Sequence, residues 1–97
     1  MAINSYADQA TRDIHFDINS RHARTIPQAI WPVARRKLNA IDAATSLADL
    51  SAPGMHLEKL RGDLAGRHSI RINDQYRITF LWSAAGADDV KVCDYHQ

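Results

Sequence analysis

The feature that most constrains the fold is a change in the spacing of apolar residues halfway along the chain. Before residue 45, apolar residues recur every three or four positions, which is typical of amphipathic helices. After residue 66, three segments alternate apolar and polar side chains and are rich in β-branched and aromatic residues: 67–72, 76–82 and 90–95. The sequence therefore predicts an α+β fold in which two N-terminal helices pack on a small antiparallel β-sheet.

The chain is 97 residues long, which fits a single domain spanning residues 1–97. Its longest apolar run, around residues 78–82, is far too short to cross a bilayer, and its first residues lack a signal-peptide pattern. We therefore expect a cytoplasmic protein that does not contact a membrane. The single cysteine, Cys93, excludes an internal disulfide and any CxxC metal or redox motif.

The apolar spacing predicts one helix over residues 7–16 and a second that ends near Ala44. Pro32 gives this second helix either an early kink or a true start near Trp31. A turn at residues 73–75 and a loop at residues 83–89 would join the three strands. The stretch from His56 to Leu60 is ambiguous between a strand and a turn of helix.

Side-chain parity fixes the pairing of the first two strands. A three-residue turn pairs Ile72 with Tyr76 and sets Arg71 opposite Arg77, which keeps the apolar side chains together on one face. The helices must cover that face, so the other face is open and bears Arg71, Arg77 and Tyr95. Two arginines opposite each other need a compensating carboxylate or an anionic ligand; two splayed arginines bridged by solvent are an equal alternative.

Positive charge is unevenly distributed, although the formal net charge is only +1. No acidic residue lies between Asp17 and Asp42, whereas that stretch contains four arginines and one lysine. Three of these cations, Arg35, Arg36 and Lys37, fall on the flank or back of the second predicted helix. They predict contacts with RNA phosphates, and an ordinary solvated helix face is the alternative.

The C-terminal sequence Asp94-Tyr95-His96 places an acid, a phenol and an imidazole beside the basic face. RNA cleavage by the 2′-OH needs a base, an acid and cations that stabilise charge on the phosphate. His96 could transfer protons, Lys59 and Arg71 could hold the phosphate oxygens, and Tyr95 could stack on a base. A histidine this close to the chain end is otherwise a solvated tail residue. A two-ligand metal site at Asp94 and His96 is a weaker alternative, and we expect no metal.

Several strings resemble the HigB-type toxins of the RelE superfamily. The resemblance spans residues 20–96, in order and at the expected spacing, and the strings are RRKLNAIDAATSLADL at 35–50, PG at 53–54, HLEKL at 56–60, GD at 62–63, SIRINDQYR at 69–77 and DYH at 94–96. The combination of the last two is the most specific. Two positions depart from the common pattern: Met55 replaces a frequent polar residue and His68 a frequent aromatic one.

This resemblance implies a RelE-like, microbial-ribonuclease-like α+β fold and an endoribonuclease activity. The activity is a ribosome-dependent mRNA endoribonuclease that uses no cofactor and inhibits translation on the 70S ribosome. The partner would be a HigA-type helix-turn-helix antitoxin, through which the toxin reaches operator DNA. The matching active-site residues are His56, Lys59, Arg71, Asp94, Tyr95 and His96, and Arg77 joins the three helix cations as an RNA contact.

Two other functions remain open from the residues themselves. A non-catalytic RNA- or DNA-binding module would use the same basic face, and a regulatory interaction protein would use Trp31, Leu81 and Trp82 as a partner surface. Loss of cleavage without loss of binding in a His96 variant separates a nuclease from a binding module.

Overall fold

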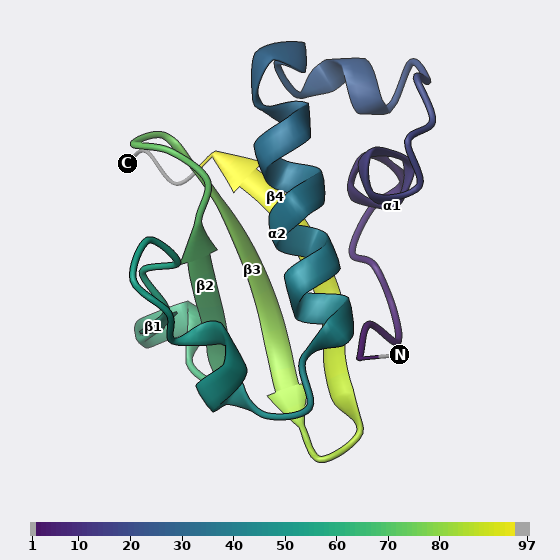
Figure 1. The fold of residues 1–97 in the computed structure, drawn as a ribbon. Helices are drawn as coiled ribbons and strands as arrows, with labels where there is room; N and C mark the ends of the chain where they lie inside the picture. Colours follow the sequence, from purple (N-terminus) through teal and green to yellow (C-terminus); the bar gives the residue numbers. More distant parts are fainter. Residues whose placement is uncertain (1, 95–97) are drawn as a thin grey trace.

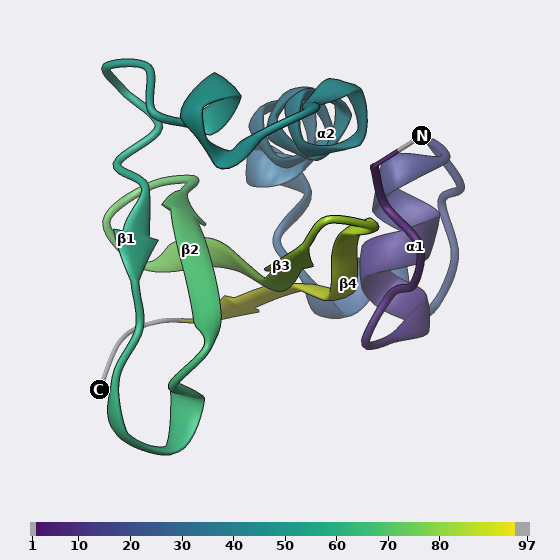
Figure 2. The same ribbon diagram turned by 90° about the horizontal axis from the view of Figure 1, so that it is seen from below.

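The computed structural model describes residues 2–94 and shows two helices against a four-stranded sheet (Figure 1). The elements are α1 (Gln9–His15), α2 (Trp31–Ala43), β1 (Glu58–Lys59), β2 (Arg67–Arg71), β3 (Tyr76–Ser83) and β4 (Gly86–Asp94). The strands follow the order β1-β2-β3-β4, and every neighbouring pair is antiparallel. Viewed from below, α2 lies over one face of the sheet and α1 lies beside β4 (Figure 2).

The predicted class, helices packed on an antiparallel sheet, is confirmed, but the N-terminal position of both helices is correct only in part. Both precede the strands, yet α2 occupies the middle of the chain. The first described residues form an extended segment that runs parallel to β4, with bridges from Ile3 to Ala87 and from Tyr6 to Val90. The segment thus covers the β4 edge of the sheet, which leaves fewer backbone groups unpaired there.

The start of α2 follows from its sequence. Pro32 stands in the first turn, where its missing N–H breaks no helical hydrogen bond. Ala34, Leu38 and Ile41 are fully buried, as the spacing of three and four predicts. Of the two alternatives at Pro32, the true start near Trp31 is correct, and the predicted end near Ala44 is confirmed.

The predicted register of β2 and β3 is confirmed. Ile70 lies opposite Ile78 and Arg71 opposite Arg77, and the amide of Ile72 donates to the carbonyl of Tyr76 at 2.9 Å. The apolar side chains of this register enter the core under the helices, which includes the fully buried Ile14, Leu38, Ile41, Leu50, Ile70, Ile78, Phe80 and Val90.

One loop prediction differs from the structure, and one open alternative is decided by it. The loop predicted over 83–89 is wrong, because Ser83 pairs with Gly86 and β4 begins there, which leaves only residues 84–85 in the turn. The ambiguous stretch 56–60 contains the short strand β1 at Glu58–Lys59, so the strand alternative is correct there. In β4 a bulge near Asp89, whose φ is 54°, shifts the register between Thr79 and Leu81. Simple alternation does not anticipate that shift.

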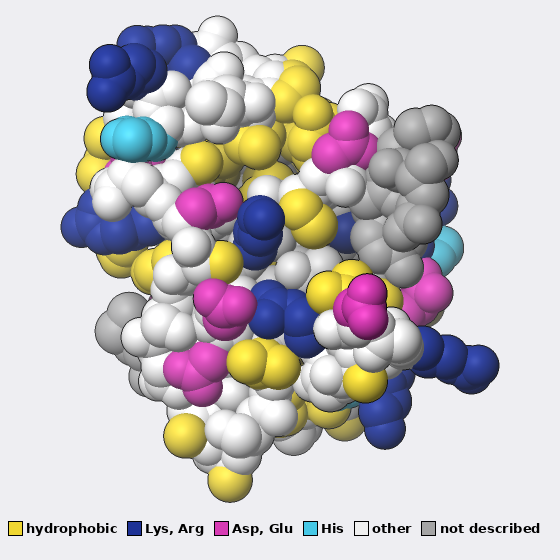
Figure 3. Space-filling model, turned by 180° about the vertical axis from the view of Figure 1, so that it is seen from behind, with side chains coloured by type: hydrophobic (Ala, Val, Ile, Leu, Met, Phe, Trp, Pro, Cys, Tyr) yellow, Lys and Arg dark blue, Asp and Glu magenta, His cyan; other side chains and the backbone are white. Residues whose placement is uncertain are grey.

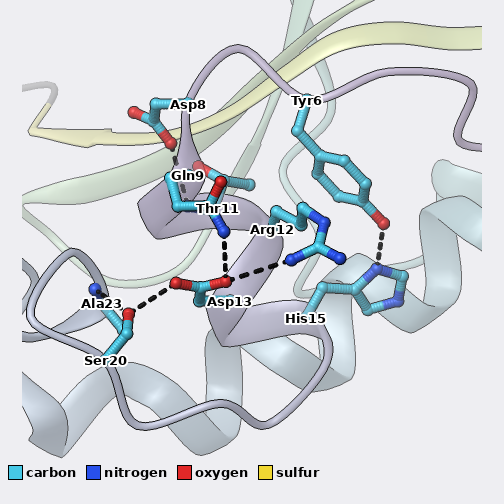
Figure 4. A network of polar contacts seen from close by, with 9 residues as sticks. All are labelled: Tyr6, Asp8, Gln9, Thr11, Arg12, Asp13, His15, Ser20 and Ala23. Atoms are coloured by element: carbon cyan, nitrogen blue, oxygen red, sulfur yellow. Dashed lines mark hydrogen bonds and ion pairs between the residues drawn. The ribbon is translucent and has the colours of Figure 1, made fainter.

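A polar network holds α1 in place (Figure 4). The Asp8 carboxylate accepts the Thr11 amide at 2.9 Å and caps the helix. The Thr11 hydroxyl in turn accepts the Val92 amide at 2.9 Å, which ties α1 to β4. The nearly buried Asp13 carboxylate accepts the Ser20 hydroxyl at 2.5 Å, and this hydrogen bond lowers the pKa of Asp13.

Between residues 2 and 94, neither helix has the length and apolar character that a membrane span requires.

Candidate active site

The end of the sheet at the β2–β3 turn gathers several of the predicted site residues. Arg71 and Arg77 lie opposite each other on the face away from the helices. Arg71 is paired with Asp74, which lies within the turn, and Arg77 is paired with Glu58 of β1 at 2.7 Å. The carboxylates that we expected as one means of offsetting the two cations are therefore present, as Asp74 and Glu58.

The two arginines differ in exposure. The Arg77 side chain is 15% exposed, and it donates to the hydroxyl of the fully buried Ser69 at 3.1 Å. The Arg71 side chain is 36% exposed, and its partner Asp74 is 94% exposed. Arg77 is thus built into the sheet surface, whereas Arg71 is available to an incoming anion.

His56 lies beside both arginines. Its backbone carbonyl accepts a hydrogen bond from Arg77 at 3.4 Å, and the carbonyl of the preceding Met55 accepts the Arg71 amide at 2.8 Å. The His56 backbone is in the left-handed region at φ 49°, and its side chain is exposed. The structure therefore brings the backbone at His56 close to Arg71 and Arg77.

Asp94 ends β4 at the same end of the sheet. It lies opposite Tyr76, and the Gln75 side-chain amide donates to its carboxylate at 3.0 Å. Tyr95 and His96 lie outside the described residues. The roles expected of Tyr95 and His96 therefore stay predictions, and the Asp94–His96 metal pair stays the weaker alternative.

Lys59 is not brought together with the arginines by the strand register. It lies opposite His68, whereas its neighbour Glu58 lies opposite Ser69 and shares a face with Arg77. The His68 ring stacks on Phe80 with centroids 6.0 Å apart, and burial with the nearby Lys59 charge lowers its pKa. Since β1 is an edge strand, Lys59 can reach the open face only around that edge.

The three helix cations differ in their surroundings. Arg36 is exposed on α2. Arg35 donates to the carbonyl of Ile14 at 3.0 Å and pairs with Asp17 at 2.9 Å. Lys37 donates to the backbone carbonyls of Gly54 and Arg71. Arg36 is therefore the cation of this helix that faces solvent most freely.

The face away from the helices carries both signs of charge. Lysine and arginine side chains alternate there with aspartate and glutamate side chains over the centre of the surface (Figure 3). Sequence reasoning placed Arg71 and Arg77 on this face but missed their partners Asp74 and Glu58. Parity would have placed Glu58 beside Ser69 once β1 was known to be a strand. Within residues 2–94, no group of three or more His, Cys, Asp or Glu side chains is arranged to hold a metal ion.

Comparison with known proteins identifies the family. Residues 4–96 match the model of the HigB-like toxin family, described as the RelE-like toxin of the type II toxin-antitoxin system HigB. "Toxin HigB-1" of Vibrio cholerae is 44% identical over 68 residues, which are 69% of this chain and 70% of that protein. "Endoribonuclease HigB" of Proteus vulgaris is 37% identical over 60 residues, which are 62% of this chain and 65% of that protein.

Solved structures show the same fold at low sequence identity. One chain of the structure described as the YoeB-YefM complex from Staphylococcus aureus matches with a TM-score of 0.61 and 20% identity. The match covers 100% of this chain and 100% of that chain. The YoeB/ParE toxin from Agrobacterium tumefaciens matches equally completely, with a TM-score of 0.60 and 18% identity. The match to the family model extends over nearly all of the sequence, including the strands that carry Arg71, Arg77 and Asp94, and the chain therefore belongs to the HigB family of RelE-like toxins of type II toxin-antitoxin systems.

Proposed function

We propose that this chain is an endoribonuclease toxin that cleaves mRNA on the 70S ribosome and thereby inhibits translation. One observation carries the proposal most directly: the partly exposed Arg71 lies at one end of the sheet, beside Arg77 and the turn that bears His56. The name of the Proteus vulgaris relative, "Endoribonuclease HigB", supports the same activity.

The reaction that suits these residues is attack of an RNA 2′-oxygen on the adjacent phosphorus. The new oxygen–phosphorus bond forms as the bond to the 5′-oxygen breaks, a base takes the 2′-OH proton, and an acid protonates the leaving oxygen. Negative charge builds on the phosphate oxygens, and a guanidinium such as Arg71 stabilises it through paired N–H donors. This chemistry proceeds with protein side chains alone, so the proposal includes no cofactor.

The proton-transfer groups in this proposal are His96 and His56. His96 follows Asp94 by two residues in the sequence. Asp94 would orient a neighbouring side chain. Tyr95 would stack on a base or donate a hydrogen bond to the RNA.

One lysine and two arginines outside this centre complete the proposed RNA surface. Lys59 would add a second cation to the phosphate by reaching around the β1 edge, and Arg77 would add positive potential next to Arg71. Arg36 on α2 is exposed and would contact ribosomal RNA phosphates.

Family membership implies an antitoxin as the partner, and we propose that it is a HigA-type helix-turn-helix protein. Such a partner would link the toxin to operator DNA without direct contact between the toxin and the bases. Action on translating ribosomes would place the protein in the cytoplasm.

The test is a reconstituted translation reaction containing 70S ribosomes, a defined mRNA and the purified chain. The expected result is new mRNA 5′ ends that appear with the wild-type chain and fall roughly 10²- to 10⁴-fold in rate with His96→Ala. Binding of His96→Ala to the ribosome should be unchanged. Wild-type binding without any cleavage would instead support the non-catalytic RNA-binding module.

A further inference from the structure

We propose that Lys37 is a positioning residue of the active site, and that it holds the backbone beneath Arg71 and His56 without contacting RNA. This inference rests on the proposed function, since it assigns the residue to the same site. It also differs from our expectation that Lys37 belongs with the RNA-binding cations of its helix.

The geometry of the Lys37 ammonium carries the proposal. Its Nζ donates to the carbonyl of Arg71 at 2.7 Å and to the carbonyl of Gly54 at 2.9 Å. These two carbonyls belong to the end of β2 and to the turn that precedes His56, which are separated by 17 residues in the sequence. Lys37 comes from α2, which lies across the sheet (Figure 1). Its side chain therefore joins three parts of the fold.

The two carbonyls flank the backbone that supports the site. The Arg71 amide donates to Met55 at 2.8 Å, so the turn and the strand end already touch through one hydrogen bond. Gly54 and His56 both have left-handed backbones, at φ 90° and φ 49°. A non-glycine residue in that region is strained and persists only when its surroundings hold it there. The ammonium supplies that restraint through a charge-assisted donor to the turn.

These two hydrogen bonds leave only one N–H donor of the Lys37 ammonium for a phosphate. An ammonium has three N–H donors, and two of them are used by these carbonyls. The side chain is half-buried, and this burial lowers the pKa of Lys37, with the charges of Arg36 and Arg71 adding to the effect. A lysine that served mainly to attract RNA would instead extend into solvent.

The expected consequence is a loss in turnover more than in binding. Reacting groups misplaced by about 1 Å can lose roughly 10²-fold in rate. We therefore expect Lys37→Met, which keeps the aliphatic stem and removes the donors, to lower kcat about 10- to 100-fold with KM changed by less than about threefold. Lys37→Arg restores donors to both carbonyls and should recover most of kcat.

The experiment measures kcat and KM for ribosome-bound mRNA in wild type, Lys37→Met, Lys37→Arg and a matched control, Lys91→Met. Lys91 is an exposed lysine on β4 that lies opposite Thr79, and its variant loses the same charge without removing either hydrogen bond of the Lys37 ammonium. Antitoxin binding by each purified variant verifies folding. Unchanged kcat with a raised KM in Lys37→Met would overturn the proposal and return Lys37 to the RNA-binding group.

Hydrogen exchange gives a second readout that does not depend on cleavage. The Arg71 amide should exchange at least about tenfold faster in Lys37→Met than in Lys91→Met, since its acceptor turn loses a tether. Equal exchange in the two variants would overturn the proposal even if wild type cleaves RNA. A wild-type chain that cleaves no RNA would refute the proposed function, whereas the exchange result would still test whether Lys37 holds this backbone. If Lys37→Met does not fold, Lys37→Gln takes its place in both measurements.

Discussion

Arg71 and Arg77 lie directly opposite each other on β2 and β3, and each guanidinium is paired with a different carboxylate. Asp74, the partner of Arg71, is almost fully exposed, and exposed ion pairs contribute at most about 1 kcal/mol. An RNA phosphate could therefore replace Asp74 at little energetic cost. Arg77 is largely buried against Ser69 and Glu58. The two arginines therefore have different roles although they are paired across the two strands.

Arg71→Ala is expected to remove activity and leave the fold intact. Removing a cation that stabilises developing charge costs roughly 10²- to 10³-fold in rate. The Tm should change little, because the lost ion pair is exposed. Rates of mRNA cleavage and thermal unfolding of the same preparation check both parts. Near wild-type cleavage by Arg71→Ala would contradict its place in the site.

Arg77→Met is expected to destabilise the fold. The substitution leaves the buried Ser69 hydroxyl without this donor and removes the Glu58 pair, for which a cost of about 1–3 kcal/mol is typical. Glu58→Gln removes only the charge of the more exposed partner and should cost less than about 1 kcal/mol. Urea unfolding of both variants measures the difference. Equal, small losses would mean that Arg77 is a surface residue like Arg71.

The register of the β2–β3 hairpin could be predicted from the sequence because only one parity keeps Ile70, Ile72 and Ile78 on the same face. The path of β4 could not be predicted from parity. Ala87 and Val90 are both buried although they are three residues apart, since the bulge near Asp89 inserts an extra residue. Strict alternation of apolar and polar residues does not identify residues 86–89 as part of a strand, and we therefore predicted a loop there.

The roles of the helix cations also depend on tertiary contacts. Spacing places Arg35, Arg36 and Lys37 outside the apolar stripe of α2, and the structure agrees. However, the partners of Arg35 and Lys37 are backbone carbonyls of Ile14, Gly54 and Arg71, which are distant in sequence. Backbone carbonyls occur at every residue, so nothing in the residue types identifies those particular acceptors.

Gly86→Ala is expected to destabilise the fold strongly. Gly86 has φ 114°, and a Cβ added there would overlap the carbonyl oxygen of Ala2 in the N-terminal segment. Backbone strain and overpacking together should cost about 2–3 kcal/mol or more. Gly66→Ala is the matched control, since Gly66 has φ 91° with open space around it, so only the strain applies. Similar unfolding free energies for the two variants would show that the N-terminal segment moves aside freely.

The last prediction concerns acid stability and the Asp13 network. Hydrogen bonds from Ser20 and Gln9 hold the pKa of Asp13 below its ordinary value, although burial opposes them. A carboxyl with a lowered folded-state pKa stabilises the fold fully above its unfolded pKa of about 4, and this stabilisation is lost as the pH falls through the folded-state pKa. Asp13→Asn should therefore be less stable than wild type at pH 7, and the gap in Tm should narrow below about pH 4. Asp49 also has a lowered pKa, but it is present in both proteins, so its contribution to the pH dependence of Tm cancels in the comparison. A Tm difference that stays constant from neutral to acid pH would show that the Asp13 charge does not stabilise α1.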